Sequence, residues 1–209
     1  MDRYLTELIG TFFLVLTIGC VSLEPAGGIS PPLAVAAVLT AVIYAGGHIS
    51  RAHYNPAVTA AFFLRGALPR SDIAPYIAAQ IAGALLAVGV ALELKPGAAA
   101  APLVVGVAPL IIAEFLFTFV MVFVILNVAT TKGTSGNSFY GIAISSAVLA
   151  GALSVGEISG SVLNPAAALA RCLLGLSPWS SLGLYSAAHF GAAVAAVGAF
   201  NAVTRAERR

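Results

Sequence analysis

The chain has 209 residues, of which 60% are hydrophobic and only 9% are charged. Soluble globular proteins average roughly 45–50% apolar and about 25% charged residues, so ten basic and eight acidic side chains cannot give this chain a solvated surface. The formal net charge of +2 is too small to attract a polyanion. The composition therefore indicates an integral membrane protein and excludes disordered, collagen-like, disulfide-rich and nucleic-acid-binding chains.

Six apolar runs are long enough to cross a bilayer, whose ~30 Å hydrocarbon core takes about 20 helical residues. They cover residues 5–23, 32–49, 73–92, 103–129, 139–155 and 180–203. Residues 1–4 carry one Arg and one Asp, a weak start for a signal peptide, so we expect the first run to be a retained span. Two further apolar segments, 55–64 and 164–174, are too short to span.

Basic residues are distributed unevenly between the two sides of these spans. With both termini in the cytoplasm, the basic residues that lie inside are Arg3, Arg51, Arg65, Arg70, Lys132, Arg205, Arg208 and Arg209. Only Lys95 and Arg171 then lie outside. Cytoplasmic loops of membrane proteins are enriched in Lys and Arg, so we expect a multi-pass protein of the cell membrane with cytoplasmic termini.

The two halves of the chain repeat each other. Gly-His-Ile-Ser at 47–50 precedes Asn-Pro-Ala at 55–57, and Gly-Glu-Ile-Ser at 156–159 precedes Asn-Pro-Ala at 164–166, an offset of 109 positions (164 − 55). Three spans in each half is an odd number, so the second half must be inverted relative to the first. Inverted repeats with interrupted helices place their site near the bilayer midplane. The sequence predicts a single channel domain, with repeats at about 1–101 and 102–209.

Each Asn-Pro-Ala has the features of a helix start. Asn is a favoured N-cap residue, and Pro suits the first helical position because its missing N–H needs no partner there. A helix of ten residues is about 15 Å long, half the hydrocarbon core. The residues expected at the midplane, where two such half-helices meet end to end, are Asn55, Pro56, Ala57, Asn164, Pro165 and Ala166. A single Asn-Pro usually marks a turn, but two copies in matched register favour the half-helix interpretation.

This meeting point predicts a selective pore. Each helix N-terminus carries roughly half a positive charge, so a cation at the midplane is repelled by two of them. If the side-chain oxygens of Asn55 and Asn164 cap their helices, the amide N–H groups remain as donors to the lumen. A water oxygen that accepts from both cannot continue a proton-conducting wire. We therefore expect passage of small neutral solutes and rejection of ions and protons.

These residues resemble the aquaporin/glyceroporin (major intrinsic protein) family. Residues 48–59, His-Ile-Ser-Arg-Ala-His-Tyr-Asn-Pro-Ala-Val-Thr, are similar to its signature, and 7–12, Glu-Leu-Ile-Gly-Thr-Phe, to its first-helix motif; Gln80 matches a third-helix position. The resemblance covers the whole chain. It implies six full helices and two re-entrant half-helices, a homotetramer with one pore per subunit, and passive transport without a cofactor. The implied partners are water, small neutral solutes and the lipid bilayer.

The chain departs from the family at the constriction. An Arg usually follows the second Asn-Pro-Ala, whereas this chain has Ala167; by the family's spacing the other three constriction residues are Val35, Ala152 and Ser161. This ring is wide, uncharged and largely apolar. We expect it to pass glycerol, urea, and boric or arsenous acid as well as water. The alternative is a strict water channel.

Arg171 lies one helical turn beyond Ala167 on the same predicted face. It has two interpretations: a residue of the outer vestibule, or an anchor that extends to the membrane interface. Glu157 stands where the first repeat has His48, and an unpaired carboxylate in a membrane is costly. We therefore expect Glu157 to pair with Arg171.

The remaining polar residues favour structural roles. The resemblance implies that Glu7 and Glu114 accept hydrogen bonds from backbone N–H groups of the re-entrant loops, although a proton relay is an alternative. His48 and His53 are expected to brace the first loop or line the cytoplasmic vestibule, since no further metal ligands are suitably spaced. We interpret His189 as a packing residue or an interhelical hydrogen-bond partner.

An enzyme and a secondary transporter are the alternatives to a channel. An enzyme needs clustered acid, base and nucleophile or metal groups, and the sequence has no such motif, so no catalytic residue, metal or cofactor is expected. A secondary transporter also uses interrupted helices. It differs from a channel because its flux saturates and responds to ion gradients.

Overall fold

The computed structural model describes residues 1–23, 30–98, 100 and 102–204. The elements in chain order are α1 (Asp2–Ser22), α2 (Pro31–Ser50), α3 (Pro56–Leu64), α4 (Arg70–Leu94), α5 (Val107–Thr130), the 3-10 helix η1 (Lys132–Thr134), α6 (Tyr140–Ser159), α7 (Pro165–Leu173) and α8 (Ser181–Val203). Six of these helices are long and apolar enough to cross a membrane. The predicted all-α fold is confirmed. Arg205, Arg208 and Arg209 lie outside the described residues.

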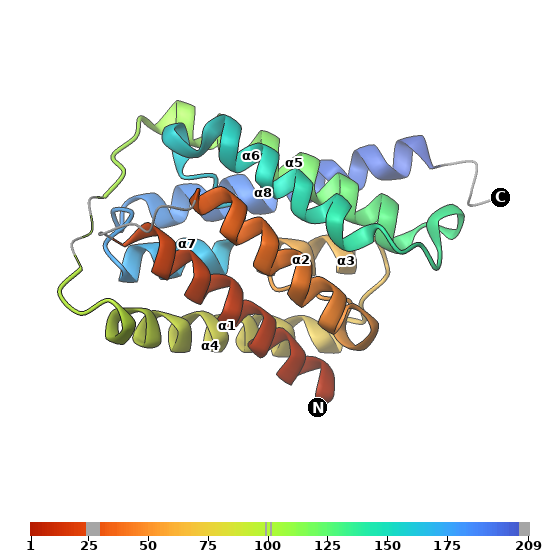
Figure 1. The fold of residues 1–209 in the computed structure, drawn as a ribbon. Coiled ribbons are helices and arrows are strands. Elements are labelled where there is room, and N and C mark those ends of the chain that lie inside the picture. Colours follow the sequence, from red (N-terminus) through yellow and green to blue (C-terminus); the bar gives the residue numbers. More distant parts are fainter. Residues whose placement is uncertain (24–29, 99, 101, 205–209) are drawn as a thin grey trace.

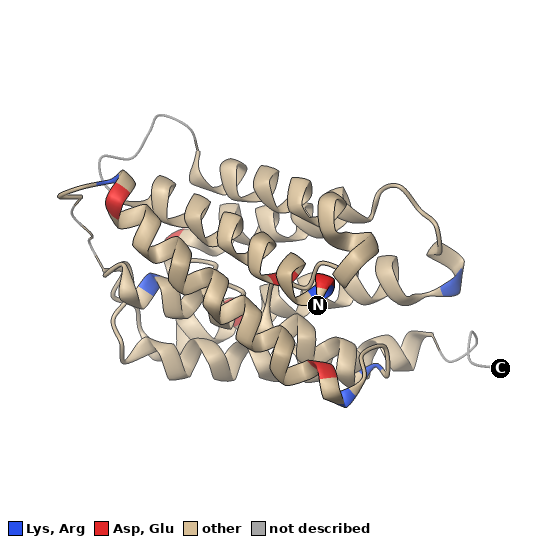
Figure 2. Ribbon diagram, turned by 90° about the horizontal axis from the view of Figure 1, so that it is seen from below, with Lys and Arg blue, Asp and Glu red and all other residues tan. Residues whose placement is uncertain are grey.

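The predicted spans agree with the helices to within a few residues at most ends. The largest differences are four residues each: α5 begins at Val107 rather than at 103, and α6 ends at Ser159 rather than at 155. Residues 103–106 are not helical, and Leu103 N–H bonds the carbonyl of Leu176, in the loop between α7 and α8. The long helices carry few charged residues along their length. Most of the charged residues lie toward the two ends of the bundle (Figure 2).

The long helices form a bundle in which each half of the chain contributes the same sequence of elements. In the first half α1 packs against α4 and α2, and in the second half α5 packs against α8 and α6. The start of α1 and the end of α8 lie at one end of the bundle, which we call the terminal end; the other is the distal end (Figure 1). The short helices α3 and α7 lie in the terminal and distal halves respectively (Figure 1).

The two half-helices connect the repeats. Helix α3 packs against α4 of its own repeat and α8 of the other, and α7 packs against α8 of its own repeat and α4 of the other. Each nine-residue half-helix is ~14 Å long at 1.5 Å per residue. Since α3 and α7 also contact each other, the two together take the place of one further crossing of the bundle.

Small residues allow the helices of each pair to approach closely. A Cβ on Gly83 of α4 would collide with the backbone of α1 at the Leu8 carbonyl and lie 3.1 Å from Phe12 N. Membrane helices associate largely through such close packing, because lipid tails are as apolar as the side chains. At the terminal end, Asp72 forms an ion pair with Arg3 and accepts a hydrogen bond from Tyr4 Oη at 3.0 Å. These contacts fix the start of α1 to the start of α4.

Candidate functional site

The two Asn-Pro-Ala segments form the predicted capped helix starts. Asn55 and Asn164 have extended backbones, with φ of −158° and −153°, and each is followed by Pro at the first helical position. Asn55 Oδ1 accepts the N–H of Ala57 at 2.9 Å, and Asn164 Oδ1 accepts the N–H of Ala166 at 2.9 Å. Both asparagines are 5% exposed. The capping geometry expected from the sequence is therefore present in both repeats.

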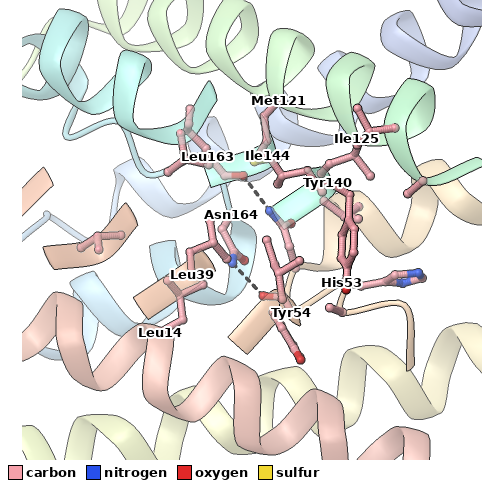
Figure 3. Close-up of a pocket in the computed structure, with 18 of the residues that line it drawn as sticks. Leu14, Leu39, His53, Tyr54, Met121, Ile125, Tyr140, Ile144, Leu163 and Asn164 are labelled. Atoms are coloured by element: carbon pink, nitrogen blue, oxygen red, sulfur yellow. Dashed lines mark hydrogen bonds between the residues drawn. The ribbon is translucent and has the colours of Figure 1, made fainter. Parts of the chain in front are cut away.

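Each asparagine also bonds the loop of the opposite repeat. Asn55 Nδ2 donates to the Leu163 carbonyl at 2.9 Å, and Asn164 Nδ2 donates to the Tyr54 carbonyl at 2.9 Å. Figure 3 draws both bonds as dashed lines. A side-chain amide has two N–H donors, so one donor of each asparagine holds the two loops together and one remains for a solute. These crossed bonds join the half-helices at their N-terminal ends.

The loops before the half-helices contain residues with backbones that L-amino acids rarely adopt. Positive φ occurs at Arg51, Ala52 and Tyr54 in the first loop and at Ser161 and Leu163 in the second. Each such residue costs roughly 1–2 kcal/mol. These backbone conformations turn the chain from the end of a long helix to the start of a half-helix. Strong local hydrogen bonds are needed to offset their cost in free energy.

Buried carboxylates supply that hydrogen bonding in the first repeat. Glu7 is fully buried, and its Oε1 accepts from Ser50 Oγ at 2.7 Å and from His53 N–H at 2.9 Å. Its Oε2 accepts from Tyr54 N–H at 2.7 Å and Gln80 Nε2 at 2.8 Å. Four donors offset much of the cost of burying this group.

The second repeat uses the same arrangement with one change. Glu114 accepts from Ser159 Oγ and from the N–H groups of Val162 and Leu163, at 2.7 to 2.9 Å. The fourth partner is His189 Nε2 at 2.8 Å, at the position that Gln80 holds in the first repeat, 109 residues earlier. His189 is fully buried. The interpretation of His189 as an interhelical hydrogen-bond partner is therefore confirmed.

The two histidines of the first loop lie in different surroundings. His53 is 4% exposed, its Nδ1 lies 3.1 Å from Thr59 Oγ1, and its ring packs 4.1 Å from that of Phe62. His48 is exposed at the end of α2. Both line the cavity described next. Within the described part of the chain, no group of three or more His, Cys, Asp or Glu side chains is placed to hold a metal ion.

A cavity of about 1570 Å³ passes both asparagines. Its lining runs from Ser22 and Pro31 at the distal end to Lys132 and Asn137 at the terminal end. Between these ends the wall is mostly apolar and comes from four long helices, with Leu14, Leu39, Ile43, Met121, Ile125 and Ile144. Figure 3 shows several of these side chains around Asn164. A hollow of this kind through a bundle of membrane-spanning helices defines a membrane channel.

All four residues expected at the constriction line this cavity. Val35 and Ala152 are half-buried on α2 and α6, whereas Ser161 and Ala167 are buried in the second loop and in α7. Ser161 Oγ is buried without a hydrogen-bond partner. The ring thus presents no charge to a solute, and its one hydroxyl is buried against α6 near Gly151.

The predicted ion pair between Glu157 and Arg171 is wrong. Among the described residues, the ion pairs within 4.0 Å are Arg3–Asp72 and His189–Glu114. Glu157 is exposed at the end of α6 and needs no partner, although it lines the cavity. Arg171 instead donates from Nε to Ser177 Oγ at 3.2 Å and from Nη2 to the Leu176 carbonyl at 3.4 Å.

Several contacts of the site were not predicted from the sequence. The acceptors of the crossed bonds are backbone carbonyls of Tyr54 and Leu163, which no motif marks. Ser50 and Ser159 repeat at the same offset of 109 as the asparagines, and this periodicity could have identified them as partners of the carboxylates. The apolar residues of the wall carry no comparable signal, because lipid-facing residues of the same helices have the same character.

Comparisons with known proteins agree with this architecture. Residues 1–200 match the family described as Major intrinsic protein. The chain is 34% identical to Aquaporin NIP1-4 of Oryza sativa subsp. japonica, over 97% of this chain and 77% of that protein. It is also 34% identical to Aquaporin NIP1-1 of Zea mays, over 97% and 75% respectively. The solved aquaglyceroporin of Plasmodium falciparum superposes with a TM-score of 0.75 at 16% identity, over 99% of this chain and 98% of that one.

The chain belongs to the major intrinsic protein family. Members of this family are channels and not enzymes, so the predicted multi-pass channel for water and small solutes such as glycerol is confirmed at that level.

Proposed function

We propose that the protein is a passive, wide-filter channel for water and for uncharged solutes that carry hydroxyl or amide groups, such as glycerol, urea, boric acid and arsenous acid. The observation that carries this proposal is the ring of Val35, Ala152, Ser161 and Ala167 in the wall of the cavity. Three of these side chains have no polar atom. A ring with no charge and small side chains leaves space for solutes larger than water.

The midplane is one barrier to ions and protons. The N-terminal ends of α3 and α7 meet there, and their partial positive charges oppose a cation. The second N–H of Asn55 and that of Asn164 are donors to a passing oxygen. An oxygen that accepts from both is oriented so that it cannot relay a proton along the file.

The assembly and orientation belong to the same proposal. The resemblance to the family implies a homotetramer of single-domain subunits, and exposed apolar side chains such as Phe13 and Leu116 offer surface for contacts between subunits. Arg3, Arg51, Arg65, Arg70 and Lys132 precede or follow spans at the terminal end. Because cytoplasmic loops are richer in basic residues, we place the terminal end in the cytoplasm and the protein in the cell membrane.

Flux measurements on purified protein in liposomes test the permeants. We expect stopped-flow shrinkage in glycerol, urea and sorbitol gradients to show water, glycerol and urea permeability well above that of empty vesicles. A guanidinium at the ring narrows it, so Ala167→Arg is expected to lower glycerol permeability at least tenfold while water permeability falls less. Ala202→Arg, on the exposed surface of α8 outside the cavity, is the matched control.

Two outcomes contradict the proposal. Fast water flux without glycerol or urea uptake identifies a strict water channel. Solute uptake that saturates and collapses with an ionophore identifies a secondary transporter.

A further inference from the structure

Arg171 is the feature of the cavity that the proposed function does not use. It lies on α7 four residues beyond Ala167, which places its Cα ~6 Å further toward the distal end. Both residues line the cavity. The ring at Ala167 is uncharged, so the first cationic side chain that a solute meets on the distal side of that ring is Arg171.

The guanidinium of Arg171 is fixed by the loop that follows its own helix. Its Nε donates to Ser177 Oγ, and its Nη2 donates to the Leu176 carbonyl. In return, the carbonyl of Arg171 accepts the N–H groups of Leu176 and Ser177 at 2.8 and 3.3 Å. A long side chain held at two points has lost most of its freedom to turn toward the membrane interface. These contacts favour the vestibule interpretation of Arg171 over the interface anchor.

Gly160 makes room for this guanidinium. A Cβ at Gly160 would lie 3.2 Å from Arg171 Nη2, and Gly160 has φ of +89°. At the repeat-related position, 109 residues earlier, the chain has Arg51 with φ of +68°. The backbone conformation therefore does not by itself demand glycine. The contact with Arg171 gives a second reason why this position has no side chain.

The charge of Arg171 is not cancelled by a carboxylate. No Asp or Glu oxygen of the described residues lies within 4.0 Å of it, as Asp72 pairs with Arg3 and Glu114 with His189. A guanidinium has five N–H donors, and the bonds to Ser177 and Leu176 leave three without a partner among the residues that the structure describes. The side chain is half-buried and lines the cavity. It combines a positive charge that has no carboxylate within 4.0 Å among the described residues with donors suited to hydroxyl oxygens.

We propose that Arg171 is the charge filter of this channel, set one helical turn distal to the uncharged ring that selects solutes by size. This inference rests on the proposed function and specifies it. Arg171 repels cations before they reach the ring and binds the oxygen atoms of entering hydroxyl solutes. Size selection and charge selection then occur at two levels of the pore.

The test compares permeation of a small cation with permeation of water in the same proteoliposomes. Radiolabelled methylammonium uptake and stopped-flow water flux are measured for the wild type, Arg171→Ala, Arg171→Lys and Lys95→Gln. We expect Arg171→Ala to raise the ratio of methylammonium to water permeability at least tenfold, because the ring behind it carries no charge. Arg171→Lys keeps the charge and is expected to stay within about threefold of the wild type.

Lys95→Gln is the matched control, since it removes a positive charge near the distal end of α4 from a residue outside the cavity. It is expected to leave the ratio unchanged. Arg171→Gln is measured as well, because it removes the charge but keeps an N–H donor. It is the second neutral variant in case Arg171→Ala does not assemble. An unchanged ratio in both neutral variants overturns the inference while leaving the proposed function in place. A wild-type protein that passes neither water nor glycerol overturns the proposed function, and this inference with it.

Discussion

At the scale of single residues, the two repeats use different side chains as hydrogen-bond partners of their buried carboxylates. A buried carboxylate fixes each strained loop, and its fourth donor is Gln80 Nε2 in one repeat and His189 Nε2 in the other. The remaining polar atoms, Gln80 Oε1 and His189 Nδ1, are both buried without a partner. The essential feature is therefore one nitrogen donor aimed at the carboxylate, and either residue type supplies it.

This equivalence predicts the effect of substitutions at position 189. His189→Ala removes a donor from the buried Glu114 and leaves a cavity, so we expect the free energy of unfolding to fall by about 3 kcal/mol. His189→Gln copies the first repeat and is expected to cost less than about 1.5 kcal/mol. Thermal unfolding in detergent measures both.

The control on the same helix is Ser186→Ala, because among the described residues Ser186 Oγ bonds only the carbonyl of Leu182 within α8. It is expected to change stability by less than about 1 kcal/mol. Equal stability of the alanine and glutamine variants at position 189 contradicts a role for His189 as a donor.

At the scale of elements, the half-helices show what the sequence can and cannot predict. Their starts were predictable because capping by Asn and the preference of Pro for the first turn are local properties. The crossed hydrogen bonds were not, since their acceptors are the carbonyls of Tyr54 and Leu163, whose directions depend on the strained loop backbones. Local rules fix where each half-helix begins, and the opposite repeat fixes where it points.

The error at Glu157 has a similar cause. The sequence places Glu157 and Arg171 toward the same face of the membrane, but it does not show that the loop after α7 folds back. That loop brings Ser177 and the Leu176 carbonyl to the guanidinium. A partner close in sequence therefore replaced the expected partner on another helix.

The crossed bonds predict a matched loss when either asparagine is replaced. Asn164→Ala removes a cap worth roughly 1 kcal/mol and a buried hydrogen bond worth about as much, so we expect a total loss of about 2 kcal/mol. Asn55→Ala should lose a similar amount. Chemical or thermal unfolding of both variants measures the effect.

Asn127→Ala provides the comparison, because within the described part of the chain the side chain of Asn127 donates only to the Phe123 carbonyl of its own helix. We expect it to cost less than either midplane substitution. Stability losses at Asn55 and Asn164 no larger than that at Asn127 argue against the crossed bonds.

At the scale of the whole molecule, the channel is built by the inverted symmetry of the two repeats. Helices α3 and α7 enter from opposite ends, and each repeat supplies one Asn-Pro-Ala, one buried carboxylate and one strained loop. Composition and spacing indicated the membrane spans, the inverted repeat and the paired Asn-Pro-Ala segments. The role of the carboxylates was implied by the resemblance to the family, and the strained loops were not predicted. The residues that give the pore its width could be assigned only by resemblance, because the wall is built from helix faces whose orientation depends on packing.

The most direct test of the central claim is a structure of the protein in a lipid environment at a resolution that shows ordered water. The account predicts a continuous file of solvent through the cavity, with an oxygen about 2.9 Å from Nδ2 of both Asn55 and Asn164. Density that stops on either side of these amides, with side chains closing the passage between them, would contradict it.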